Sequence, residues 1–191
     1  MWRYTLIALV TCGCASQIKR VAENPNLDRS TYDGLIVYPL NNGIQNRLPW
    51  ETADKVMIDA THGIVKKEMF RYLHVWPKLL EGATGNHAER LREASMPMDS
   101  VDAHAVGIAE LNVTLLEFEP GSPFRHSVYG MYVGGGHVSL QIDMVDHRTR
   151  EKLASGVTSA NITGSFASEK DVVGPLSKAI TKFVKDRLSK K

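Results

Sequence analysis

The chain has 191 residues, of which 43% are hydrophobic and 23% are charged. This composition excludes a disordered or fibrous protein and predicts one domain of ordinary size, with or without a tether. The 23 Lys and Arg residues nearly balance the 21 Asp and Glu residues, so no basic surplus indicates nucleic acid as a partner. No apolar run of the sequence approaches the ~20 residues that a membrane-spanning helix requires, so any attachment to a membrane must be made differently.

The first residues have the order of a secretory signal. A short basic start precedes an almost entirely apolar stretch, residues 4–10, and a run of small residues, 11–15. This run resembles a bacterial lipobox, in which a signal peptidase cuts before a cysteine that carries a lipid on its thiol. Cys14 fits that pattern because Gly13 precedes it, whereas Cys12 fits poorly because it follows a threonine. The alternative is a buried N-terminal strand with two incidental thiols.

Cleavage at this lipobox would divide the chain into a signal peptide (1–13), a lipidated polar tether (14–32) and a domain (33–191). The single remaining cysteine would carry a thioether, which excludes disulfides, cysteine–metal sites and a cysteine nucleophile. A diacylglycerol and an amide-linked chain such as palmitate exceed the two hydrophobic signals that stable anchoring needs. In the lipoproteins that the segment resembles, lack of Asp after the cysteine directs the product to the outer membrane, and Ala15 stands here. We therefore expect an outer-membrane lipoprotein that faces the periplasm.

In the first half of the domain the pattern predicts a strand, a helix and a second strand. Residues 35–40 form a continuous apolar run, typical of a strand buried on both faces. The helical spacing of apolar residues predicts a helix from 51 to about 71, and residues 72–76 predict a short strand. Residues 81–100 are charged and interrupted by glycine, with a short helix over 87–94.

The second half predicts antiparallel strands followed by a helix. A long strand ending at residue 119 changes the phase of its apolar residues, and a bulge near Leu115 would produce that change. Residues 138–144 alternate as a half-buried strand, and residues 153–163 return as its partner after a polar turn. A capping box at Ser168 predicts the start of an amphipathic C-terminal helix. We expect one α+β domain, with a mixed or antiparallel sheet of about five strands and two main helices packed on it.

The C-terminal pattern resembles a domain family of unknown function that is common in bacterial lipoproteins, over roughly residues 33–188. The residues that carry the resemblance are Gly121, Arg125, Gly130, Gly134, Gly135, Gly136, Asp146, Thr149 and Leu153. It implies a fold similar to the periplasmic domain of the curli-secretion lipoprotein and to the N-terminal domain of TolB. It also implies a non-enzymatic envelope module without catalytic residues. In this chain Arg150 stands where the turn of the family usually has glycine.

The segment 130–136 is the most conspicuous candidate for a contact with a partner. Its glycines predict positive φ angles or a strongly bent strand. They do not indicate a phosphate-binding loop, because such a loop leads into a helix and here a strand follows. Its apolar residues could instead form an exposed docking loop. The arginine nearby could hold a carboxylate of Asp143 or Asp146, or one on a partner. The candidate partner-binding residues are Arg125, Met131, Tyr132 and Val133.

Other residue types give weaker indications of chemistry. The seven histidines have no metal-binding spacing, so no metal site is expected, and no motif indicates a cofactor. Glu117 and Glu119 share a strand face and could act as the paired carboxylates of a hydrolase. We expect a lipid-anchored periplasmic module that is attached to the membrane by its anchor. Its expected partner is an unidentified envelope protein, and assembly into a homo-oligomer is left open. An envelope-acting hydrolase and a subunit of a secretion channel are the alternatives.

Overall fold

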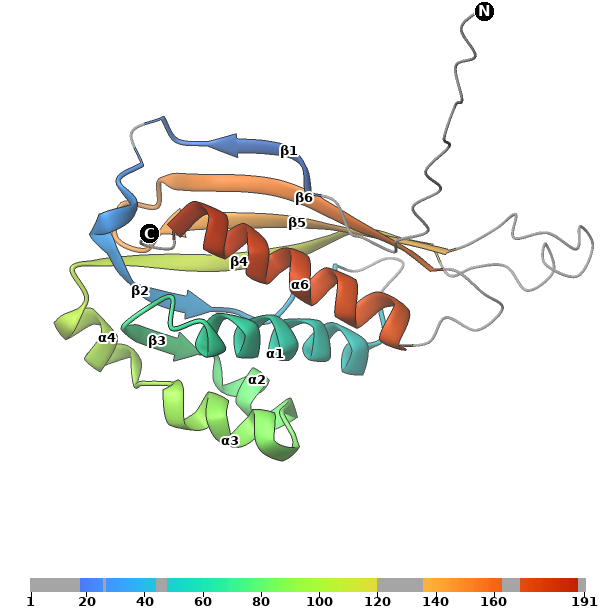
Figure 1. Ribbon diagram of the computed structural model, residues 1–191, viewed down its shortest axis with the longest axis horizontal. Helices are drawn as coiled ribbons and strands as arrows, with labels where there is room; N and C mark the ends of the chain where they lie inside the picture. The colour runs from blue at the N-terminus through green and yellow to red at the C-terminus, as the bar shows by residue number, and fades with distance from the viewer. Residues whose placement is uncertain (1–17, 26, 44–47, 120–135, 163–168, 189–191) are drawn as a thin grey trace, which may run out of the picture.

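The computed structural model describes residues 18–25, 27–43, 48–119, 136–162 and 169–188, and its centre is a six-stranded mixed sheet (Figure 1). The strands are β1 (Ile18–Glu23), β2 (Tyr32–Val37), β3 (Tyr72–Val75), β4 (Gly107–Glu119), β5 (Gly136–Asp146) and β6 (Lys152–Ile162), in the order β1-β6-β5-β4-β2-β3. The helices are η1 (Arg29–Thr31), α1 (Trp50–Lys66), α2 (Pro77–Gly82), α3 (Gly85–Ala94), α4 (Met98–His104) and α6 (Glu169–Leu188). No helix in the described part of the chain is long and apolar enough to cross a membrane.

The parallel half of the sheet contains the predicted strand–helix–strand unit. β2 pairs in parallel with β3 along one edge and with β4 along the other. Its sequence is apolar because both faces are covered: Leu35 and Val37 belong to the main core, while Ile36 packs on the α4 side. The predicted strand ends at Val37 rather than at residue 40, and α1 ends at Lys66 rather than near residue 71. The helix stops because Glu68 takes a left-handed conformation, with φ of 50°.

The antiparallel half confirms the predicted bulge. The register between β4 and β5 shifts between Leu115 and Glu117, so the apolar residues on either side of the shift stay on the same face. The turn from β5 to β6 contains Arg150 with φ of 62°, at the position where the resembled family has glycine.

One strand was not predicted, because residues 18–23 were expected to belong to a polar tether. They form β1, which pairs with β6 from Ile18 opposite Thr158 to Glu23 opposite Ala154. The strand lies at an edge of the sheet, and its register shifts between Lys19 and Ala22. A short edge strand with such a shift lacks the two-residue alternation that marks longer strands in a sequence.

Helices α1 and α6 lie side by side over one face of the sheet, as predicted (Figure 1). The core residues that the helical spacing predicted are all buried: Ala53, Val56, Met57, Ala60, Ile64, Val172, Leu176, Ala179, Ile180, Phe183 and Val184. Among the shorter helices of the described residues, which are η1, α2, α3 and α4, only α3 was predicted. α4 covers part of the opposite face, where Val101 and Ala105 pack against Ile36 and Ile108. The expected capping box at Ser168 lies outside the described residues.

Candidate functional site

Two tryptophans are exposed where the chain passes between elements. Trp50 begins α1 and is 46% exposed, while Trp76 directly follows β3 and is 43% exposed. The alternation along β3 accounts for the second one: Leu73 and Val75 are buried in the main core, so Trp76, the next residue, faces the other way. Large apolar side chains at this exposure are candidates for a contact surface.

Trp76 belongs to a group of aromatic rings on the edge of the sheet. Its ring centroid lies 5.1 Å from that of Tyr38, with the planes tilted by 42°, and 6.3 Å from that of His74 in an edge-on arrangement. His74 is fixed by a contact of 2.8 Å between its Nδ1 and the carbonyl oxygen of Met96. The Tyr38 hydroxyl donates to Glu110 over 3.4 Å, and burial, followed by the charge of Glu110, raises the pKa of this tyrosine. The side chains around the exposed Trp76 indole are therefore held in place by these contacts.

Trp50 is linked to the same region through Lys78, two residues after Trp76. The Lys78 ammonium lies 4.4 Å from the centroid of the Trp50 ring, which is a cation–π contact. The chain that leads into α1 is held by the buried side chain of Asn42, whose amide donates to the Leu48 carbonyl over 2.6 Å and accepts from the Leu48 N–H over 3.1 Å. We call Tyr38, Trp50, Trp76 and Lys78 the aromatic surface.

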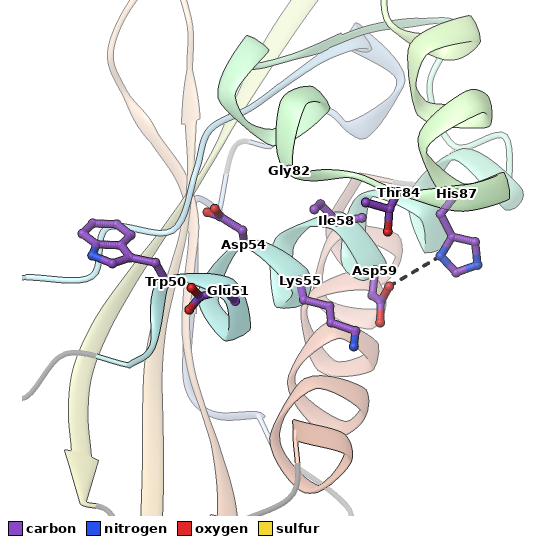
Figure 2. Close-up of a pocket in the computed structure, with 9 residues that line it drawn as sticks. All are labelled: Trp50, Glu51, Asp54, Lys55, Ile58, Asp59, Gly82, Thr84 and His87. Carbon is purple, nitrogen blue, oxygen red and sulfur yellow. Dashed lines mark ion pairs between the residues drawn. The ribbon is translucent and has the colours of Figure 1, made fainter.

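A pocket of about 430 Å³ adjoins Trp50, between α1 and the chain that joins α2 to α3 (Figure 2). Asp54 points from α1 toward Gly82, and Asp59 forms an ion pair of 3.6 Å with His87. Burial, with the charge of Glu51 adding to it, raises the pKa of Asp54. Within the described residues, no group of three or more His, Cys, Asp or Glu side chains could hold a metal ion.

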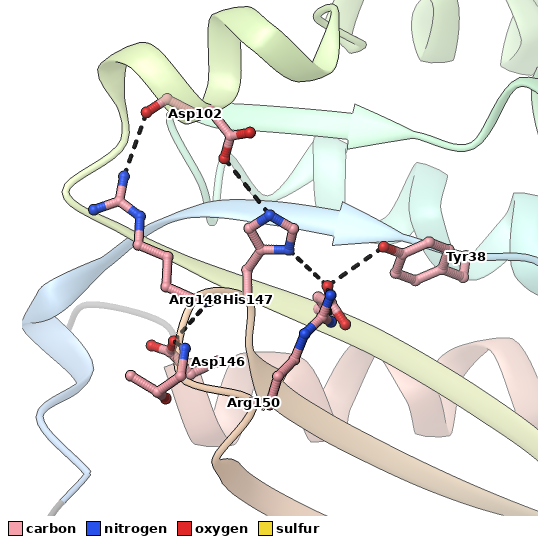
Figure 3. A network of polar contacts seen from close by, with 8 residues as sticks. Tyr38, Asp102, Asp146, His147, Arg148 and Arg150 are labelled. Carbon is pink, nitrogen blue, oxygen red and sulfur yellow. Dashed lines mark hydrogen bonds and ion pairs between the residues drawn. The ribbon is translucent and has the colours of Figure 1, made fainter.

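A buried carboxylate organises the opposite face of the sheet, near α4 (Figure 3). Glu110 is 4% exposed, and its Oε1 lies 2.6 Å from both His147 Nδ1 and Arg150 Nη1. His147 Nε2 in turn lies 3.7 Å from an Asp102 carboxylate oxygen, and Arg148 donates to the Asp102 carbonyl over 3.3 Å. These side chains contact one another, so the network, which we call the clasp, joins β4, α4 and the β5–β6 turn.

The structure does not describe the residues that the sequence favoured as sites. Cys14, Arg125, Met131, Tyr132 and Val133 all lie outside the described residues and stay predictions. The two carboxylates proposed as internal partners of the arginine have other partners: Asp143 pairs with Lys152 at 3.0 Å, and Asp146 accepts from the Tyr32 hydroxyl over 2.9 Å.

The paired carboxylates of the hydrolase alternative lie on an exposed strand face. Glu117 and Glu119 follow the bulge in β4, opposite Ser139 and His137 of β5. Neither lines the pocket of Figure 2. Trp50 and Trp76 were not predicted as site residues, although their exposed positions at the start of a helix and after a strand suit a contact surface.

The comparisons with known proteins concern the fold. No protein-family model matches the sequence, and no curated protein sequence matches it either. The structure is similar to a subunit of the PelC dodecamer from Paraburkholderia phytofirmans, with a TM-score of 0.50 and 15% identity over 92% of this chain and 99% of that chain. Lipoprotein GNA1162 from Neisseria meningitidis gives a TM-score of 0.40 and 17% identity over 80% of this chain and 96% of that chain. At such identities the likeness extends to the fold alone, and this chain therefore has an α+β fold similar to that of a PelC subunit.

Proposed function

We propose that this protein is a lipid-anchored envelope module that acts through protein contacts rather than catalysis, and that the aromatic surface is its contact face. The observation that carries the proposal is the pair of tryptophans, 46% and 43% exposed, one at the start of α1 and the other directly after the edge strand β3. Trp and Tyr dominate the energetics of protein interfaces because they bury large areas at a small entropic cost.

The strand order supports a protein partner over the membrane as the occupant of this face. Cys14 lies four residues before Ile18, which begins β1, and β1 and β3 are the two outer strands of the six-stranded sheet. Strands lie about 4.8 Å apart, so five intervals separate the two edges by about 24 Å. A lipid on Cys14 would anchor the β1 edge and leave the aromatic surface on the far side, available to a partner.

The β3 edge itself is partly covered, which favours side-chain contacts over addition of a further strand. The Met96 N–H donates to the Leu73 carbonyl over 2.7 Å, and the Val75 N–H donates to the Ser95 hydroxyl over 3.0 Å. These bonds occupy backbone groups that an added strand would need. A partner would therefore bind the rings next to the edge.

The partner is either another envelope protein or a further copy of this chain. The neighbour of similar fold is a dodecamer, which makes a homo-oligomer the first assembly to test. A heterologous contact between copies closes into a ring when its rotation allows, so the aromatic surface would then bind a different patch on the next copy. The outer membrane is the proposed location because Ala15 follows the lipobox cysteine.

Two experiments test the two halves of this proposal. Metabolic labelling with palmitate should mark the wild type and Cys12→Ala but not Cys14→Ala, and labelling that survives Cys14→Ala would contradict the anchor. Trp50→Ala with Trp76→Ala should lower the mass of the assembly in mass photometry, or the recovery of a partner from membranes, without lowering the melting temperature. Leu116→Ala, which changes an exposed apolar residue of β4 outside the aromatic surface, is the control. An unchanged assembly and unchanged partner recovery would refute this contact face.

A further inference from the structure

Helix α3 is held on α1 by a small hydrophobic cluster and a pair of histidines. The cluster contains Ile58, Ala83, Ala88 and Leu91, and it is separate from the main core under the sheet. Next to it, His62 of α1 and His87 of α3 stack with ring centroids 4.0 Å apart and planes within 8°. Because these rings bridge the two helices, their charge affects how strongly α3 is held.

The charges around the rings are unbalanced. His62 faces His87 and Arg90 from α3, and Lys66 and Asp59 from its own helix. Asp59 pairs with His87 at 3.6 Å (Figure 2). The other side of α1 packs on α6, where the uncharged Thr181 lies beside Gly63 and donates to the Ala60 carbonyl over 3.1 Å. Burial lowers the pKa of His62, and the charges of His87 and Arg90 lower it further.

We propose that this histidine pair is a pH-sensitive latch, so that protonation of both rings loosens α3 from α1 while the sheet and the α1–α6 pair stay folded. A proton on His87 makes that ring the cation of an ion pair with the carboxylate of Asp59, 3.6 Å away. A second proton on His62 places two cationic rings face to face at 4.0 Å. Arg90 and Lys66 add to the repulsion, and one carboxylate opposes it.

Movement of α3 relieves that repulsion at a small cost, because α3 contributes no strand and its cluster is small. The movement would also open the pocket of Figure 2, since Thr84 and His87 line its α3 side. The inference concerns the fold and does not depend on lipidation of Cys14, so the proposed function and this latch can fail independently.

Hydrogen exchange measured by mass spectrometry tests the latch on the purified full-length protein. Protection factors, corrected for intrinsic exchange, are compared at about pH 7.5 and about pH 5. In the wild type we expect protection of residues 85–94 to fall at least about threefold at the lower pH, with the β4–β5–β6 amides unchanged. His62→Gln and His87→Gln should abolish this change. His104→Gln is the control, because that histidine stacks on Tyr72 and has no histidine partner there.

Each outcome decides the proposal. Equal protection of α3 at both pH values in the wild type would overturn it. A fall that persists in both His62→Gln and His87→Gln would overturn it as well, since another group would then be responsible. If His62→Gln lowers the protection of α3 at both pH values, His87→Gln decides whether the histidine pair is the latch. The His87 side chain is 51% exposed, so its replacement leaves the hydrophobic cluster intact.

Discussion

Replacement of Phe183 or of Gly156 tests how α6 rests on the sheet. Phe183 is 1% exposed, and its ring lies against the backbone of β6. A Cβ atom at Gly156 would lie 2.7 Å from Cε2 of that ring and 3.1 Å from a methyl group of Ile18. The glycine therefore provides the space that the ring fills, and β1 borders the same space.

The packing around Phe183 and Gly156 sets the expected losses of unfolding free energy. Phe183→Ala removes a fully buried ring and leaves a cavity, so it should cost about 3 to 5 kcal/mol. Gly156→Ala places a methyl group inside the contact distance of the ring and should cost about 1 to 3 kcal/mol through overpacking. A leucine at 183 lacks the Cε2 atom, so Phe183→Leu should remove most of the cost of Gly156→Ala. The double variant should then lose less unfolding free energy than the two single variants lose together, by at least about 0.5 kcal/mol.

Urea-induced unfolding, followed by far-ultraviolet circular dichroism, measures these free energies of unfolding. A loss below about 1 kcal/mol for Phe183→Ala would place α6 outside the core. Additive effects of Gly156→Ala and Phe183→Leu, to within about 0.3 kcal/mol, would show that the ring and the glycine do not touch.

Three further predictions concern single residues. Arg150→Ala should lower the free energy of unfolding by about 2 to 4 kcal/mol, because it leaves the 4% exposed Glu110 without its arginine. Glu110→Gln should lower it by only about 1 to 2 kcal/mol, because the Arg150 side chain is 65% exposed. Equal losses in urea-induced unfolding would contradict the role of the clasp. Glu68→Gly should stabilise the protein by about 1 kcal/mol, since φ is 50° there, and an unchanged melting temperature would count against this. Burial raises the pKa of Asp146, but hydrogen bonds, first from the Thr149 N–H and then from Tyr32, lower it below its ordinary 3.8. The stability that the Asp146 carboxylate contributes is therefore present above pH 3.8 and lost as the pH falls through the lowered pKa. The wild type should lose more stability between about pH 5 and pH 3 than Asp146→Asn does. Parallel curves of unfolding free energy against pH for the two proteins would refute this.

Local patterns in the sequence determined much of the fold. The apolar run over residues 35–40 indicated a strand buried on both faces, and the phase change near Leu115 indicated the bulge. The helical spacing of apolar residues identified the buried faces of α1 and α6. In each case the signal was the alternation or periodicity of a continuous segment, which depends on which face of that segment is buried. The sequence also supplied the lipobox around Cys14, which depends on adjacent residues alone.

Only the tertiary structure decided which side chains meet. Glu110 is a charged residue that the local sequence does not mark as buried, and its partners His147 and Arg150 follow it by 37 and 40 residues. The aromatic surface forms because parallel pairing places the end of β3 beside the end of β2, which brings Trp76 to Tyr38. Strand order and helix packing are long-range properties, set by contacts whose partners are far apart in the chain, so no local pattern encodes them.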